Sequence, residues 1–177
     1  MAHLGIEQAD FFGYSMDAGT ALNLGVHRPG LVRKLVLLSV SFNQAGLHPG
    51  LIENVIEVTP EMLAGSPFEA EYQRLAPKQE DWPTLLRKVG ELNANIPDYS
   101  ADVIQALQPP ALIIIADSDI VRPEHAVEFF RLLGGGVIGD VVGLPSSQLA
   151  ILPGATHVTG AYKADLLVPM INSFLDA

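Results

Sequence analysis

The sequence predicts an α/β protein with a mostly parallel sheet of about four strands, flanked by helices and interrupted by one helical insertion. Four short apolar runs predict the strands, at residues 9–14, 33–40, 111–116 and 148–152. Stretches with helical spacing separate these runs, and this alternation is typical of a parallel sheet. Between the second and third runs, residues 48–108 are acidic and contain several prolines and short amphipathic pieces. We therefore expect a core at residues 1–47 and 109–177, with residues 48–108 inserted as a helical lid.

Composition argues against several classes of partner. The chain has 177 residues, of which 49% are hydrophobic, enough for one domain with a sizeable core. Its net charge of −10 argues against nucleic acid and anionic membranes as partners. The absence of cysteine excludes disulfides and thiolate metal sites. The N-terminus lacks a secretory-signal pattern, and the longest apolar run is too short to span a bilayer, so we expect a cytoplasmic protein.

The first elements of the chain surround a serine. Residues 1–8 have the pattern of a helix end that leads into the first strand, and Gly5 would be the first residue past that helix. The strand at residues 9–14 runs into a tight turn at Ser15. Small residues at helical spacing then predict a helix from Ala18 to His27.

The middle of the chain predicts one buried strand and then the insertion. The run at residues 33–40 lacks a clean alternation of apolar and polar residues, as in a strand that is buried on both faces. For residues 48–108 we expect about four short helices and no strand. One apolar face there consists of Leu51, Ile52, Val55 and Ile56.

The last third of the chain returns to sheet-like sequence. After the strand at residues 111–116, Pro123 stands at the first position of a helix that ends at Gly134. The strand at residues 148–152 leads through a turn to His157, and a final helix closes the chain. We expect these two helices to bury the following apolar residues: Ala126, Val127, Phe130, Leu133, Leu167, Ile171, Phe174 and Leu175.

One turn nearly matches a nucleophile motif. Gly13-Tyr14-Ser15-Met16-Asp17 agrees with G-x-S-x-G at four of its five positions. In that motif a sharp strand-to-helix turn exposes a serine hydroxyl, and the helix N-terminus favours developing negative charge. Serine is also a common helix cap, so a capping role for Ser15 is the alternative interpretation.

Three polar residues come just past the carboxyl ends of three predicted strands. They are Ser15, Asp119 and His157, and that edge is where open parallel sheets bind ligands. His157 would accept the proton of the Ser15 hydroxyl as general base, and Asp119 would fix the imidazole tautomer. Two alternatives stay open: Asp119 as a cap of the following helix, and Asp117 as the acid instead.

The sequence predicts neither a cofactor nor a metal site. The remaining histidines, His3, His27, His48 and His125, are scattered along the chain. Gly134–Gly139 matches G-x-G-x-x-G, but a dinucleotide-binding motif must follow a strand and open a helix. This run follows a helix, so we interpret it as a loop.

Four blocks of the sequence carry a family resemblance. They are LGIEQADFFGYSM (Leu4–Met16), HRPGLVRKLVLLS (His27–Ser39), IIIADSDIVRPEHA (Ile113–Ala126) and LPGATH (Leu152–His157). In this order and spacing they resemble the α/β-hydrolase fold superfamily, specifically the C-terminal part of a lipase-, esterase- or haloperoxidase-like member. The resemblance implies a partial α/β-hydrolase fold with Ser15 as nucleophile, Asp119 as acid, His157 as base, and the Met16 N–H as an oxyanion donor.

Two departures from the family pattern affect what we expect. Family members have several strands ahead of the serine turn, whereas fourteen residues precede Ser15 here. The missing part would include the loop with the second oxyanion donor, and losing one donor costs about 10²–10³ in rate. It would also expose the strand at residues 9–14 as an edge, through which two copies would pair. Asp17 replaces the last motif glycine, where it would crowd the turn and oppose negative charge.

These observations lead to two functional hypotheses. The first is a serine hydrolase that acts on a small carboxylic ester or related acyl substrate through a Ser-His-Asp triad, with activity impaired by the truncation and by Asp17. The second is a non-catalytic, truncated remnant that forms a homo-oligomer and binds small apolar ligands.

Overall fold

A computed structural model describes residues 1–51 and 58–177 of the chain. These residues fall into two compact units: Met1–His48 with Pro97–Ala177, called the core unit here, and Pro49–Ile96. Most of the apolar face predicted near the start of the insertion, Ile52, Val55 and Ile56, lies outside the described residues.

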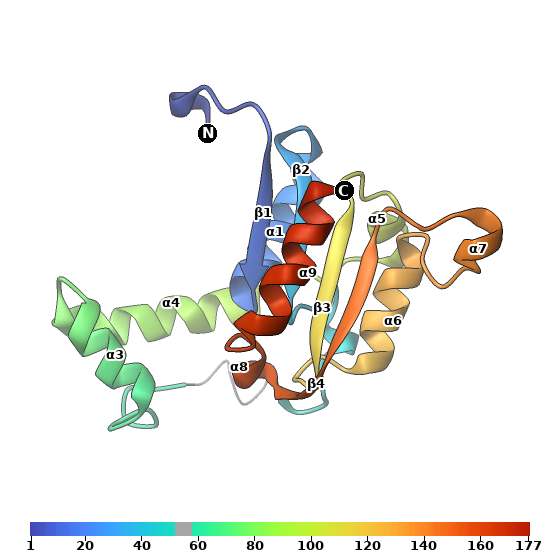
Figure 1. Cartoon of the computed structure of the whole chain (residues 1–177). Helices are drawn as coiled ribbons and strands as arrows, with labels where there is room; N and C mark the ends of the chain where they lie inside the picture. Colours follow the sequence, from blue (N-terminus) through green and yellow to red (C-terminus); the bar gives the residue numbers. More distant parts are fainter. Residues whose placement is uncertain (52–57) are drawn as a thin grey trace. The chain divides into compact units, whose positions relative to one another are not determined.

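The core unit is built on one parallel sheet with the strand order β1-β2-β3-β4 (Figure 1). Each strand pairs in parallel with the next one along the chain. The expected parallel sheet of about four strands is therefore confirmed. The strands are β1 (Ala9–Tyr14), β2 (Val32–Leu38), β3 (Ala111–Ser118) and β4 (Gln148–Thr156). The carboxyl ends of β3 and β4 lie beyond the ends that the sequence predicts, and β2 ends two residues earlier than predicted.

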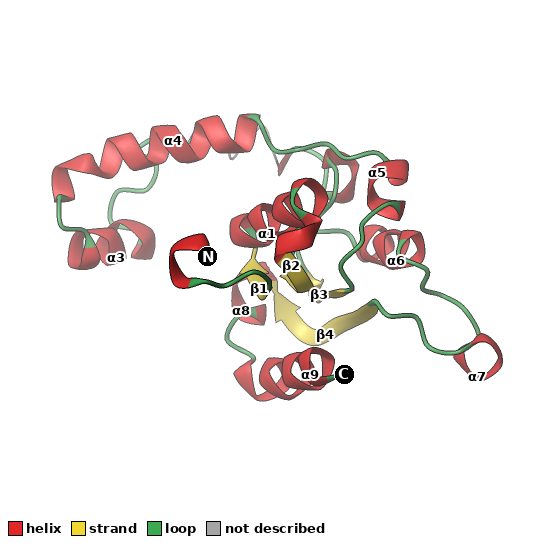
Figure 2. Cartoon of the chain, turned by 90° about the horizontal axis from the view of Figure 1, so that it is seen from above, coloured by secondary structure: helices red, strands yellow, loops and turns green. Residues whose placement is uncertain are grey.

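Helices cover both faces of the sheet, as the view from above shows (Figure 2). On one face lie α1 (Met16–His27), α5 (Ala101–Gln105) and α6 (Pro123–Leu132), and on the other lies α9 (Ala164–Asp176). None of the described helices is long and apolar enough to cross a membrane. The shorter elements of this unit are η1 (Ala2–Leu4), η2 (Pro29–Leu31), η3 (Gln44–Gly46), α7 (Gly139–Val142) and α8 (His157–Gly160).

The central strands are buried on both sides. Leu35 and Leu37 of β2 pack in the cluster that contains α1 and α6, whereas Val36 and Leu38 pack in the cluster that contains α9. All four side chains are at most 1% exposed. This two-sided burial explains why the sequence of β2 is apolar without alternation.

Helix α6 begins at Pro123 as predicted, but its buried face differs in part. Ala126 is fully buried, and Phe130 packs at the edge of the core. Phe129 and His125, which the apolar pattern did not select, are buried, whereas Val127 is partly exposed. Histidine does not count as apolar, so the apolar pattern could not identify His125 as buried. Its ring stacks on Phe42 at a ring-centroid distance of 4.1 Å.

The second unit, Pro49–Ile96, is helical where it is described. It contains α3 (Pro67–Leu75), η4 (Gln79–Asp81) and α4 (Trp82–Ala94). The Ser66 hydroxyl caps α3 by accepting from the Glu69 N–H, and the rings of Tyr72 and Trp82 lie 5.0 Å apart. The chain rejoins the core unit at Pro97, so α5 packs in the core through the buried Ile104.

His125 links α6 to the loop after β2. Its Nε2 accepts a hydrogen bond from the Phe42 N–H over 3.2 Å, which requires the neutral ring. Burial lowers the pKa of His125, and the Glu128 carboxylate, 3.6 Å from Nδ1, offsets this only in part. The unfolded chain therefore binds more protons than the folded chain as the pH falls below the ordinary histidine pKa.

From this sign we predict that the free energy of unfolding decreases as the pH is lowered from 7.5 to 5.5. Urea unfolding of the wild type and of His125→Phe, which keeps an aromatic ring but cannot titrate, tests this. The wild type should lose stability more steeply with pH than His125→Phe. Exposed His3→Gln serves as the control and should follow the wild type; equal slopes for all three proteins would contradict the prediction.

Candidate active site

Ser15 stands in the turn between β1 and α1. Its backbone adopts φ 55° and ψ −117°, a positive φ that strains any residue except glycine. Its N–H donates to the Leu38 carbonyl of β2 over 2.8 Å, which fixes the turn against the neighbouring strand. Ser15 occupies the N-cap position of α1, as the alternative interpretation has it, but its side chain makes no capping hydrogen bond to the helix.

The turn is tight because Gly13 lies against the start of α1. A Cβ on Gly13 would lie 2.4 Å from the Asp17 carbonyl oxygen and 2.5 Å from Ala18 Cα, closer than these atoms can approach. Asp17 itself lies in the first turn of α1 with an exposed side chain. The expectation that Asp17 crowds the turn is therefore wrong, and the steric need for glycine falls at Gly13.

His157 bridges the serine and the buried carboxylate. Its Nε2 lies 2.9 Å from Ser15 Oγ, and its Nδ1 lies 2.8 Å from Asp119 Oδ1. A carboxylate can only accept, so Nδ1 carries a proton, and in the neutral ring Nε2 accepts from the serine hydroxyl. The side chain of His157 is 18% exposed, whereas that of Asp119 is fully buried. The structure thus brings together the three residues that the strand-end argument selected.

Five hydrogen bonds hold the oxygens of Asp119, two of them from side chains. Besides His157 Nδ1 on Oδ1, the Ser39 hydroxyl donates to Oδ2 over 2.5 Å. Asp119 does not cap α6, because the N-cap residue of that helix is Arg122. The remaining donors to the carboxylate are the backbone N–H groups of Ala116, Ile120 and Val121.

These donors decide the charge of the carboxylate. Burial by itself raises the pKa of Asp119, but the hydrogen bonds from His157, Ser39 and the Ala116 N–H outweigh it and hold the pKa below its ordinary value. Asp119 therefore remains ionised and can stabilise a positive charge on the His157 ring.

Tyr14 holds the histidine from the side of β1. Its hydroxyl donates to the His157 carbonyl over 2.9 Å, and the two rings lie 5.3 Å apart. Burial and then the charge of Asp119 raise the pKa of Tyr14, so its phenol remains a donor at neutral pH.

Asp117, the rival for the acid role, has a different task. Its Oδ2 and Oδ1 accept from the N–H groups of Gly154 and Ala155, over 2.8 and 3.1 Å. These bonds lower the pKa of Asp117 and tie β3 to the segment that leads to His157. Asp119, not Asp117, is the carboxylate bonded to the imidazole.

Met16 is the first residue of α1, where a backbone N–H has no acceptor within its own helix. It directly follows Ser15, which is the position required of an oxyanion donor.

The sequence argument did not identify Ser39 and Tyr14 as residues of the site. The available signal was that Ser39, like the three selected residues, comes directly after a strand.

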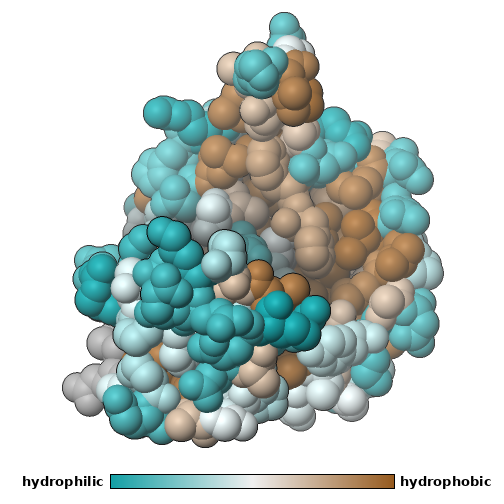
Figure 3. Space-filling view, turned by 90° about the vertical axis from the view of Figure 1, so that its left-hand side faces the viewer, coloured by the Kyte–Doolittle hydropathy of each residue, from teal (hydrophilic) through white to brown (hydrophobic). Residues whose placement is uncertain are grey.

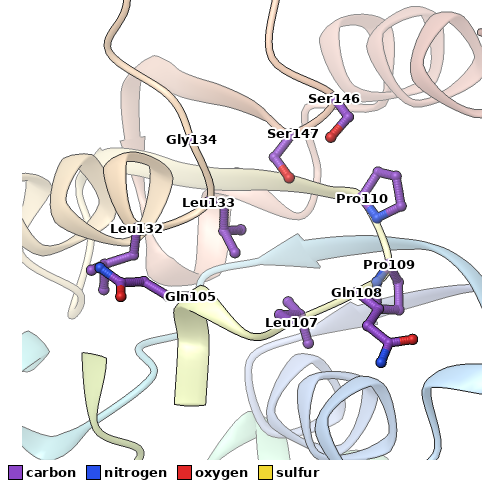
Figure 4. A pocket seen from close by; sticks show the side chains of 10 residues that line it. All are labelled: Gln105, Leu107, Gln108, Pro109, Pro110, Leu132, Leu133, Gly134, Ser146 and Ser147. Atoms are coloured by element: carbon purple, nitrogen blue, oxygen red, sulfur yellow. The ribbon is translucent and has the colours of Figure 1, made fainter. Parts of the chain in front are cut away.

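A concave region lies where β3 and β4 begin, at the end of these strands away from Asp119 and His157. Its volume is about 310 Å³, and Pro110 and Ser147 mark the starts of β3 and β4 there (Figure 4). The Ser147 hydroxyl accepts from the Ala111 N–H over 3.1 Å and so ties these strand starts together. Within the described parts of the chain, no three histidine or acidic side chains gather in a metal-binding group.

Comparison with protein-family models and with curated proteins finds no match. Solved structures, in contrast, match nearly the whole chain. An α/β hydrolase, MGS-M2, from a Medee basin deep-sea metagenome library aligns with a TM-score of 0.69 at 17% identity, over 99% of this chain and 68% of that chain. The enol-lactonase from Burkholderia xenovorans LB400 aligns with a TM-score of 0.64 at 17% identity, over 100% and 69%.

A third match is the meta-cleavage product hydrolase from Pseudomonas fluorescens IP01, with a TM-score of 0.62 at 18% identity, over 99% of this chain and 67% of that chain. The chain thus spans about two thirds of the length of these enzymes. Identities this low establish the fold and not the substrate. The chain has a partial α/β-hydrolase fold, whose four parallel strands carry Ser15, Asp119 and His157 at one edge.

Proposed function

We propose that this protein is a serine hydrolase that acts on carboxylic esters or related acyl substrates through a triad of Ser15, His157 and Asp119. The hydrogen-bonded chain from Ser15 Oγ through both ring nitrogens to a buried carboxylate carries the proposal. Hydrolases aligned over the same strands support the reaction class, and an enol-lactonase is among them.

In the proposed reaction, His157 Nε2 takes the hydroxyl proton as Ser15 Oγ attacks the substrate carbonyl carbon. The ionised Asp119 stabilises the imidazolium, which then donates its proton to the departing alkoxide. The products of this half-reaction are an alcohol and an acyl-serine. Water, activated by the same ring, releases the acid and restores Ser15, so the cycle needs no cofactor.

The negative charge that develops on the carbonyl oxygen would face the Met16 N–H and the N-terminus of α1. The exposed carboxylate of Asp17 adds an opposing charge in the same helical turn. We therefore propose that Asp17 lowers the activity of the enzyme.

We propose that the helical unit Pro49–Ile96 is the lid insertion of this fold. Two features support this role. Along the chain the unit is inserted between β2 and β3, and several of its apolar side chains are more than 60% exposed. They are Met62, Phe68 and Leu75.

A second candidate function is non-catalytic: a homo-oligomer that binds small apolar ligands. One observation favours it, namely that β1 pairs only with β2 among the described strands. Phe12 on β1 is 56% exposed, and Leu4 and Ile6 just before β1 are also exposed. Figure 3 views the molecule from the side of β1 and shows apolar surface there. Two copies paired through β1 would cover this edge.

We predict that a fluorophosphonate labels Ser15, with release of fluoride and formation of an Oγ–phosphorus bond. Intact-mass spectrometry and peptide mapping measure the adduct. Ser15→Ala should remove labelling and lower p-nitrophenyl acetate hydrolysis at least about 100-fold. Ser41→Ala is the matched control and should behave as the wild type. A wild-type protein that stays unlabelled, or a label on another residue, would contradict the proposal.

We further predict that Asp17→Gly raises the labelling rate by about 2- to 10-fold. The gain is modest because solvent screens an exposed carboxylate. Asp17→Asn keeps the side-chain size and removes the charge, so it should produce most of the same gain. An unchanged or lower rate in both variants would show that Asp17 does not oppose the chemistry.

For the second candidate, we predict a dimer mass in small-angle scattering at micromolar concentration. Phe12→Lys on the exposed edge should shift the mass to that of a monomer, because charged residues block edge-to-edge pairing. If the wild type has the mass of a monomer at every micromolar concentration measured, the proposed oligomer is contradicted.

A further inference from the structure

Ser39 occupies a strained position directly after β2. Its φ is +59°, a conformation that glycine adopts readily and other residues adopt at a cost. The residue is 3% exposed, and its N–H donates to the Ile114 carbonyl of β3 over 2.7 Å, so the surrounding strands hold it in place. A residue whose only task were to make this turn would be better replaced by glycine.

The Ser39 hydroxyl supplies what glycine cannot. It donates to Asp119 Oδ2 over 2.5 Å, while His157 donates to the other oxygen, Oδ1, over 2.8 Å. Together with the N–H groups of Ala116 on Oδ2 and of Ile120 and Val121 on Oδ1, these two side-chain donors fix the plane of the carboxylate. That plane determines where the imidazole lies, and the imidazole in turn faces Ser15 Oγ.

We propose that Ser39 is a positioning residue for the hydrolytic centre: its hydroxyl holds the Asp119 carboxylate in the orientation that aims His157 at Ser15. The inference rests on the proposed function, because it assigns Ser39 a task in that same site. Ser39 does not contact the reacting atoms and acts only through Asp119.

The other ionisable groups near this chain have different anchors. Tyr14 bonds to the His157 backbone carbonyl, and Asp117 bonds to the N–H groups of Gly154 and Ala155. Removing the Ser39 hydroxyl leaves all of these bonds in place. A change in the behaviour of His157 after substitution of Ser39 is therefore attributable to Asp119.

Two variants of the full chain separate positioning from folding. Ser39→Gly removes the hydroxyl and relieves the backbone strain, so it should fold with a thermal midpoint near that of the wild type. Ser39→Ala removes the hydroxyl and keeps the strain. Ser41→Ala, two residues along the same segment, is the matched control. Circular dichroism establishes that each variant folds.

Two readouts then test the proposal. The first is the second-order rate of Ser15 phosphonylation against pH. Both Ser39 variants should react about tenfold more slowly at neutral pH, because a hydrogen bond to a charged group has been lost. The pH midpoint of the profile should move upward, since a carboxylate with fewer donors attracts the imidazolium more strongly.

The second readout needs no activity: the downfield proton resonance of His157 Nδ1–H, which reports its bond to Asp119. It should shift in Ser39→Gly and stay fixed in Ser41→Ala. If the resonance shifts but the wild-type protein is never phosphonylated, the positioning role stands and the proposed function fails. If Ser39→Gly folds with an unchanged resonance and an unchanged labelling profile, the inference about Ser39 is overturned.

Discussion

The arrangement of the site depends on one buried carboxylate. Asp119 is removed from water, and a carboxylate in that position is stable only when its oxygens accept several hydrogen bonds. Its donors come from the ends of β2 and β3 and from the start of α8. Satisfying Asp119 therefore fixes three chain segments relative to one another, and it places the His157 ring between the carboxylate and Ser15.

Strain in the backbone accompanies this arrangement. Among the described residues, the two that are not glycine and have positive φ are Ser15 and Ser39. They follow adjacent parallel strands, and their hydroxyls form the two ends of one hydrogen-bonded chain through His157 and Asp119. Strained residues persist only where their surroundings hold them, and such positions concentrate at functional sites. The close contact at Gly13 adds a steric constraint to the same turn.

Much of the fold follows from the sequence because burial on both faces produces continuous apolar runs, as in β2 and β3. The placement of Ser15, Asp119 and His157 also follows, since parallel strands present their carboxyl ends at one edge. Asp117 stayed open as an alternative to Asp119, because the sequence predicts the end of β3 at Ala116 whereas the strand ends at Ser118, directly before Asp119. The role of Ser39 depends on a turn conformation that no local pattern of residues specifies.

The proposed function requires that the Ser15 hydroxyl, the His157 imidazole and the Asp119 carboxylate form one catalytic centre. A crystal structure of the fluorophosphonate-treated protein tests it most directly. The account predicts electron density for a phosphonyl group bonded to Ser15 Oγ, with one phosphonyl oxygen within hydrogen-bond distance of the Met16 N–H and His157 still bonded to Asp119. An unmodified Ser15 whose Oγ lies beyond hydrogen-bond distance of the His157 ring would contradict the claim, although the fold would stand.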